Sequence, residues 1–326
     1  MKCRPIIVAI STALFSLGGP ALSAETTRLT PIAPVEAEGF KSPVGEQYAG
    51  KIVFSKKPIN RGPKSDARFV SSFKLRKDKI FLRTFVSASA ENQLRKTGWQ
   101  CASNRRITTD VSVNGGPPTA IDERKLETRD WGRYLTWSLE DDRTIHLTKG
   151  PLKYGAKTDY RYDFAMTVVP QLKDGQENSL VFSSRGSCEA DAGDKREMKH
   201  WEMAVGTLTL TVGKRGRASF TKRVGPLLPK NAMRGGAALA KRAMRAVAKK
   251  WPTEQVLAAR VTSTEWDSSH SRRSIDAVVV VREKGAAECR IFDLSFHQKG
   301  VRGRYQNAMT FSVGGDEAFP CVNAKR

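Results

Sequence analysis

The stretch WEMAVGTLTLTV, residues 201–212, carries the clearest structural signal in the chain. In its second half Leu208, Leu210 and Val212 alternate with threonines. Alternating apolar and polar side chains are typical of a β-strand that buries one face and leaves the other in water. This stretch therefore predicts an antiparallel sheet with a single apolar face.

Similar short runs recur on the N-terminal side of this stretch, from residue 47 onward, with turn residues between them. Short strands at such regular spacing favour an antiparallel β-sandwich, which we place at residues 47–213. A single weak helix is expected at 89–95. The expected strands are 51–54, 68–75, 79–86, 107–113, 134–139, 143–147, 160–169, 179–182 and 201–212.

The segment on the C-terminal side is strongly basic. Residues 214–250 contain twelve lysines and arginines and no acidic residue. Glycines and prolines in residues 214–230 predict a basic linker. A helix is then expected from about Ala237 to Trp251, because Ala240, Met244, Val247 and Trp251 recur at helical spacing. Pro252 ends it.

Four strands follow the helix, at 256–266, 275–282, 289–297 and 304–313. The short connections between them predict an antiparallel meander. Phe292, Leu294 and Phe296 share one strand face, and we expect the helix to pack on it. Residues 231–326 would then form an α+β domain whose architecture resembles the cystatin-like and NTF2-like folds. The predicted fold class is mainly β with this second α+β domain, and the resemblance carries no functional weight.

The N-terminus has the features of a secretory signal peptide, expected at residues 1–23. Lys2 and Arg4 precede an apolar core at 6–17, and small residues follow at Ala21 and Ser23. The core is shorter than the roughly 20 residues needed to span a bilayer. We expect cleavage near Ser23/Ala24, a flexible arm at 24–46, and a periplasmic or secreted protein.

Four cysteines remain after the expected cleavage. In an oxidising compartment they predict two disulfides, which permits three pairings. We expect the nearest-neighbour choice, Cys101 with Cys188 and Cys289 with Cys321. A zinc site is the alternative, but no Cys-x-x-Cys pair supports it. No metal and no cofactor are expected.

The basic segment is the leading functional candidate in a chain of net charge +23. Cations clustered along a linker and a helix can bind an anionic polymer, an anionic membrane surface or a partner protein. The alternative is a solvated helix and linker that only maintain solubility. Nucleic acid is not expected as the natural ligand outside the cytosol. The expected binding residues are Lys241, Arg242, Arg245, Lys249, Lys214, Arg215 and Arg217.

A second cationic stretch, residues 149–162, interleaves lysines and arginines with tyrosines. It can stack on rings and contact phosphates, although its tyrosines can equally cover a sheet face. The basic residues it contains are Lys149, Lys153, Lys157 and Arg161.

Catalysis is the weaker hypothesis. Asp293, Ser295 and His297 are the residue types of a catalytic triad, but on a strand they stand about 7 Å apart, too far for triad contacts. No nucleophile or metalloprotease motif occurs. The sequence therefore favours an exported, non-enzymatic binding or envelope-associated protein. The alternative is a hydrolase that acts on envelope polysaccharide or peptide at a cleft between the domains. A third possibility is a module that binds through an exposed strand edge.

Overall fold

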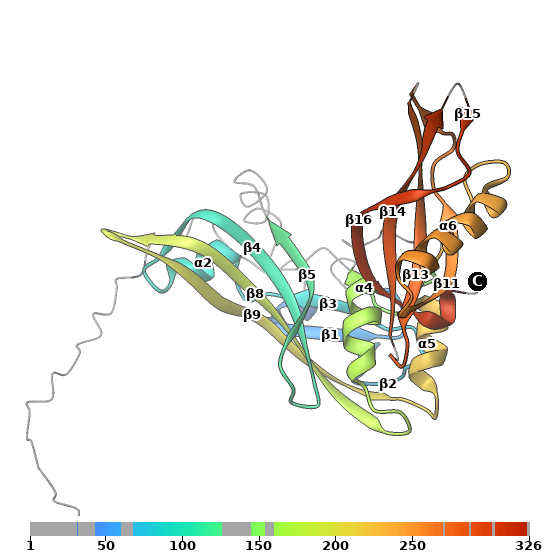
Figure 1. Cartoon of the computed structure of the whole chain (residues 1–326). Helices are drawn as coiled ribbons and strands as arrows, with labels where there is room; N and C mark the ends of the chain where they lie inside the picture. Colours follow the sequence, from blue (N-terminus) through green and yellow to red (C-terminus); the bar gives the residue numbers. More distant parts are fainter. Residues whose placement is uncertain are drawn as a thin grey trace, which may run out of the picture.

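The computed structural model describes residue 31 and residues 43–59, 68–125, 145–153, 160–269, 271–286, 288–301 and 304–324. The expected signal peptide, its cleavage site, most of the arm and the expected strand at 134–139 lie outside these residues. The last residues of the expected arm belong to a short helix, α1 (Pro43–Gln47), in which Val44 is buried. The described chain is mainly β, as predicted (Figure 1).

The N-terminal part is one curled eight-stranded sheet (Figure 1). Its strands are β1 (Lys51–Ser55), β2 (Ser72–Lys74), β3 (Phe81–Phe85), β4 (Gln100–Val113), β5 (Thr119–Lys125), β6 (Ile145–His146), β8 (Glu177–Ala192) and β9 (Lys195–Thr211). They run in the order β5-β4-β8-β9-β1-β3-β6, and β2 also pairs with β9. Both β1 and β2 lie parallel to β9. The expected two-sheet antiparallel sandwich is therefore not confirmed.

The alternation in β9 places leucines in the core, as expected. Leu208 and Leu210 are buried in one cluster with Phe54 and Phe182. Gly206 lies at the point where β9 changes partner from β1 to β2, and a Cβ there would come within 2.0 Å of the carbonyl oxygen of Ile52. This close approach of two backbones admits only glycine.

Helices cover the apolar face of this sheet. Three helical turns, α4 (Tyr160–Asp163), the π-helical η1 (Phe164–Val168) and the 3₁₀-helical η2 (Val169–Gln171), occupy the segment that we predicted as a strand at 160–169. That prediction is wrong: Ala165, Val168 and Val169 are buried at positions i, i+3 and i+4, the spacing of one helix face. A period near 3.6 buries a helix face, whereas a strand buries every second residue.

Residues 214–230, where a linker was expected, contain a helix and a strand. Helix α5 (Gly216–Val224) buries Phe220 and Val224 in the core of the N-terminal sheet. Strand β10 (Pro226–Leu227) pairs in parallel with β7 (Leu152–Lys153). The apolar residues among the basic ones thus fix this segment to the first part of the molecule.

The C-terminal part is a second sheet with one long helix on a face (Figure 1). The helix is α6 (Gly236–Lys250), and the strands are β11 (Glu254–Val261), β12 (Asp267–Ser268), β13 (Arg272–Glu283), β14 (Cys289–Val301), β15 (Arg304–Tyr305) and β16 (Thr310–Phe319). The main order is β11-β13-β14-β16, with β12 beside β13 and β15 beside β14. Ala240 and Val247 of α6 are buried with Leu294 and Phe296 of β14 in one apolar cluster.

The two parts meet through α4, α5 and the C-terminal turn η3 (Cys321–Asn323). The hydroxyl of Tyr162 in α4 donates to the carbonyl oxygen of Ala318 at 2.9 Å. The side-chain amide of Asn323 donates to the carbonyl of Pro226 at 3.0 Å. Leu228 is buried with Phe319 on the face of the second sheet away from α6. The basic segment is thus part of the junction.

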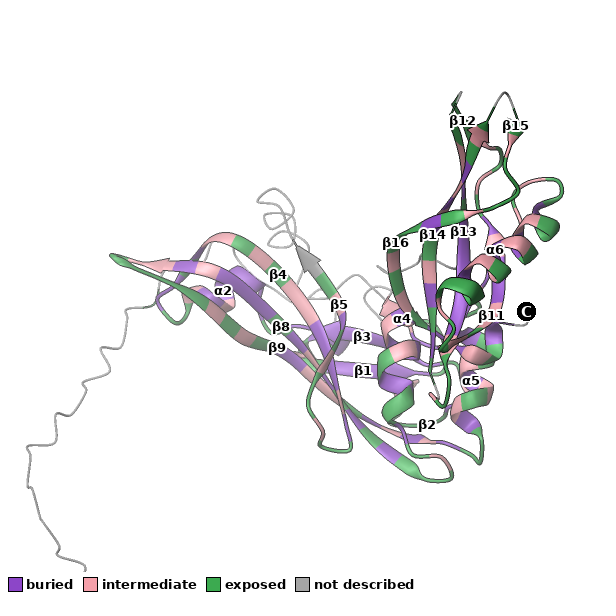
Figure 2. Cartoon of the chain, in the orientation of Figure 1, coloured by how far each residue is buried: buried purple, intermediate pink, exposed green. Residues whose placement is uncertain are grey.

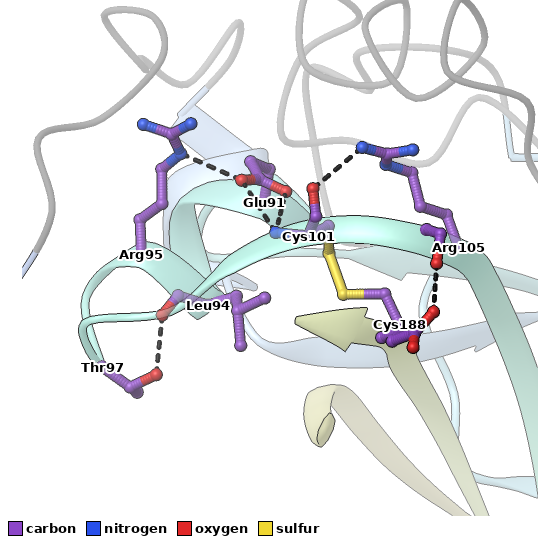
Figure 3. The surroundings of a disulfide bond; sticks show 9 residues. Glu91, Leu94, Arg95, Thr97, Cys101, Arg105 and Cys188 are labelled. Atoms are coloured by element: carbon purple, nitrogen blue, oxygen red, sulfur yellow. Dashed lines mark hydrogen bonds and ion pairs between the residues drawn. A yellow bond between two sulfur atoms is a disulfide. The ribbon is translucent and has the colours of Figure 1, made fainter. Parts of the chain in front are cut away.

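Both expected disulfides are present. Cys101–Cys188 joins β4 to β8, and Cys289–Cys321 joins β14 to η3. Figure 3 shows the first, beside helix α2 (Ala90–Arg95). There the buried carboxylate of Glu91 accepts from the backbone amide of Cys101 at 3.3 Å and from Nε of Arg95 at 3.0 Å. Two disulfides fit a location outside the cytosol. Among the described residues, no helix is long and apolar enough to cross a bilayer.

Candidate functional site: the cationic face of α6

Helix α6 forms where the sequence predicts it and is anchored by small apolar residues. Ala240, Ala243 and Val247 face the sheet and are buried. The segment before the helix is held to β11, because the side chain of Asn231 accepts from the amide of Val261 at 2.9 Å. The helix is therefore fixed at one end and along one side, and its opposite side faces water (Figure 2).

Three cations form a row on this exposed side: Lys241, Arg245 and Lys249. Four residues of an α-helix span about 6 Å, so the row is about 12 Å long. Among the described residues, no carboxylate lies within ion-pair distance of any of the three. Like charges four residues apart destabilise a helix by about 0.2–0.5 kcal/mol per pair. The row therefore costs stability unless an anion neutralises it. We call these three residues the α6 row.

Arg242 does not belong to the row. It is half-buried, and its Nη2 donates to the backbone carbonyl of Asn307 at 2.7 Å, in the connection between β15 and β16. This contact fixes the loop against the helix. Arg242 was expected among the binding residues, and the structure shows it in this backbone contact beside the row.

The other expected binding residues lie at the start of α5, apart from α6 (Figure 1). Lys214 and Arg215 are exposed in the turn between β9 and α5. Arg217 pairs with Asp174, with Nε 3.3 Å from Oδ2, and its Nη1 donates to the carbonyl of Pro170 at 2.9 Å. The structure thus divides the seven predicted residues between two places, and Arg217 holds the fold together.

A cluster of aromatic side chains, which the sequence analysis did not predict, lies at the end of α6. Trp251 contacts Phe292 and Phe311, with ring centroids 5.0 and 5.3 Å apart. The ammonium of Lys250 lies 4.5 Å from the ring centre of Phe311. This cation–π contact places one more charge next to the row. The adjacent Lys250 and Trp251 at the helix end were the feature of the sequence that could have indicated this cluster.

The residues with triad chemistry do not assemble. Ser295 donates to Asp276 at 2.6 Å, whereas His297 contacts Ser312 through Nε2 at 3.2 Å. Nδ1 of His297 has no hydrogen-bond partner in the described part of the chain. Burial and the charge of Arg272 lower the pKa of His297, and Asp276 opposes this. These side chains form a polar sheet face without an oriented base.

A shallow groove of about 490 Å³ lies where β1 and β2 separate along β9. Its lining includes Lys51, Ile52, Phe69 and Thr207, and the described lining holds no carboxylate and no histidine. A hydrolase site of the expected kind needs two carboxylates about 5–10 Å apart. The groove does not supply such a pair from the residues described.

Sequence reasoning also missed a cationic cluster around His146. Burial, and then the charges of Lys79, Lys149, Arg161 and Arg223, lower the pKa of this histidine from 6.5 to about 4. The cationic stretch 149–162 had indicated Lys149 and Arg161, whereas Lys79 and Arg223 come from distant segments that no local pattern could connect to it.

In the described residues, no group of three histidine, cysteine, aspartate or glutamate side chains could hold a metal ion. No protein-family model matches the chain, and no curated protein matches it.

Proposed function

We propose that this protein is an exported binding protein that contacts an anionic component of the cell envelope through the α6 row. One observation carries this proposal. Lys241, Arg245 and Lys249 project into water from a helix packed on a sheet, without an ion-pair partner in the described chain. A fixed row of cations loses little conformational freedom when it meets a matching row of anions.

The basic segment supports an anionic ligand rather than a neutral one. It contains twelve cations and no acidic residue over residues 214–250. Each cation that replaces a condensed counterion on a polyanion releases that ion, so the affinity falls as salt rises. An anionic membrane surface or an acidic polysaccharide meets this requirement equally, and the experiment below separates them.

The cellular location and the division into domains are part of the same proposal. The signal peptide at 1–23 would direct the chain to the periplasm or the exterior, where the two disulfides are stable. Residues 231–326 would form the ligand-presenting domain, with the helix-on-sheet architecture similar to that of cystatin-like and NTF2-like proteins. The N-terminal sheet would serve as its support.

A hydrolase remains the alternative function. It would need an acid and a base placed around a concave pocket. No observation in the described chain favours it, so no catalytic residue is assigned.

The proposal is tested by titrating the disulfide-bonded protein against three probes over a range of salt concentrations. The first probe is a vesicle that contains phosphatidylglycerol. The second is heparin, and the third is single-stranded DNA. The triple variant K241Q/R245Q/K249Q should lose most of the affinity for one probe. The slope of log affinity against log salt should fall by two to three, because about three counterions are no longer released.

The matched control is K77Q/K173Q/K195Q, which removes the same charge from exposed lysines of the first part. If the control loses as much affinity as the α6 variant, net charge alone explains binding and the α6 row is not the site. If neither wild type nor variant binds any probe, the proposed function fails.

A further inference from the structure

The ring of His146 is held in a fixed position. His146 lies in β6 opposite Phe81 of β3, and the two rings stack with centroids 4.1 Å apart. Its Nε2 is 3.3 Å from the hydroxyl oxygen of Thr148. That hydroxyl also accepts from the amide of Ile80 at 3.1 Å. Strand pairing, stacking and a hydrogen bond thus fix one titratable group at this place.

Four segments bring cations to this histidine, and one of them is α4, which carries Arg161. Lys79 lies two residues before Phe81, which pairs with His146. Lys149 is three residues beyond His146, and its amide donates to the His146 carbonyl at 3.3 Å. The end of α5 is the fourth segment. A Cβ on Gly150 would lie 2.4 Å from Cα of Val224, so the two backbones touch. The preceding residue, Arg223, also reaches the carbonyl of Leu75 through Nη2 at 3.5 Å.

Within the described residues, no carboxylate neutralises three of these charges. Lys79, Lys149 and Arg223 are exposed, and no carboxylate of the described chain lies within ion-pair distance of them. Asp78, next to Lys79, is engaged elsewhere: it accepts from the amide of Lys74 at 2.7 Å and is 3.1 Å from Nζ of Lys56.

The same surroundings act on the pKa of His146. Its pKa is lowered to about 4 by burial and then by Lys79, Lys149, Arg161 and Arg223, and none of the charges that act on it is acidic. Cations gathered at one place repel one another, and this repulsion is relieved when an anion binds among them.

We propose that the cluster of Lys79, His146, Lys149 and Arg223 binds a divalent oxyanion, sulfate or phosphate, either free or as part of a larger molecule. The two lysines and the guanidinium supply charge-assisted hydrogen bonds, and the imidazole becomes a further donor when it is protonated. This site is separate from the α6 row and does not depend on the proposed function.

The test follows the ring protons of His146 by NMR while sulfate replaces chloride at constant ionic strength. Sulfate keeps its double charge over the pH range of the titration, so only the protein changes. Saturating sulfate should raise the pKa of His146 by about one unit, which corresponds to about tenfold tighter binding by the protonated form. The same pKa in sulfate and in chloride would overturn the proposal.

Two variants locate the site. In K79Q/K149Q/R223Q the pKa of His146 should be higher before sulfate is added and should not respond to it. The α6 variant K241Q/R245Q/K249Q should respond as the wild type does. An unchanged response in the first variant would place sulfate elsewhere and contradict the proposal, whatever the α6 row binds. The wild-type titration decides the question even if the first variant does not fold.

A second experiment distinguishes a lipid headgroup from a free ion as the source of the oxyanion. Sedimentation with phosphatidic acid vesicles is compared between the α6 variant and a variant that also carries K79Q/K149Q/R223Q. A loss of sedimentation in the combined variant would assign the anion to a lipid headgroup. Equal sedimentation, together with the sulfate response, would assign it to a free ion or to a soluble ligand.

Discussion

Helices α5 and α6 come from the same basic segment but differ in the side chains that they bury and in the contacts that most of their cations make. Helix α5 buries the ring of Phe220, and two of its arginines, Arg217 and Arg223, contact backbone carbonyls of the first part. Helix α6 buries Gly236, two alanines and a valine, and its row of cations faces water. A run of positive charge in a sequence therefore does not show which cations bind a ligand.

The largest expected difference between the two helices is in the free energy of unfolding that is lost when a buried side chain is truncated. Phe220→Ala should reduce the free energy of unfolding by about 3–5 kcal/mol, because it empties a large, fully enclosed site. Val247→Ala in α6 should cost about 2 kcal/mol, since a smaller side chain is removed. Chemical denaturation with intact disulfides measures both. Equal losses would show that α5 anchors the chain no better than α6 does.

A smaller effect concerns pH. His146 has a pKa of about 4 in the folded protein and near 6.5 when unfolded, so the unfolded chain binds more protons between these values. Stability should be highest above about pH 6.5 and should fall by about 1 kcal/mol toward pH 4, after discounting for the exposure of the ring.

The variant His146→Gln should remove this pH dependence of stability, and Arg223→Gln should reduce it. Lys249→Gln on α6 should leave it unchanged. Thermal unfolding across pH 4–7 measures the three variants, and an effect of Lys249→Gln equal to that of Arg223→Gln would contradict the distinction between the helices.

The smallest effect compares single arginines. Arg217→Gln should cost about 1 kcal/mol, because it removes a partly exposed ion pair and a hydrogen bond to the backbone. Arg245→Gln should be neutral or stabilise by a few tenths of a kcal/mol, because it relieves repulsion from Lys241 and Lys249. Urea unfolding midpoints resolve the difference. A clear loss for Arg245→Gln would mean that this residue has a structural contact.

Local periodicity was sufficient for much of the fold. The alternation through Leu208 and Leu210 predicted β9, and the helical spacing of Ala240 and Val247 predicted α6. Both disulfides match the expected nearest-neighbour pairing, one of the three that four cysteines permit. In each case the signal lies within one element or in the count of one residue type.

The failures have a different physical origin. The segment 160–169 alternates at first, but its burial is set by the sheet and by α5, which pack around it. The linker at 214–230 was predicted from glycines and prolines. In the structure, Phe220 and Val224 pack in an apolar cluster with residues that are distant in the sequence. The His146 cluster depends on Lys79, Lys149 and Arg223, which only the tertiary fold brings together.

The contact between Gly206 and Ile52 has a consequence for natural variation. Any side chain at residue 206 would push β1 away from β9 at the only place where the two strands are paired. Proteins that share this fold should therefore keep glycine at the equivalent position even where the surrounding residues change. An alignment of such relatives could be anchored there before any functional residue is compared.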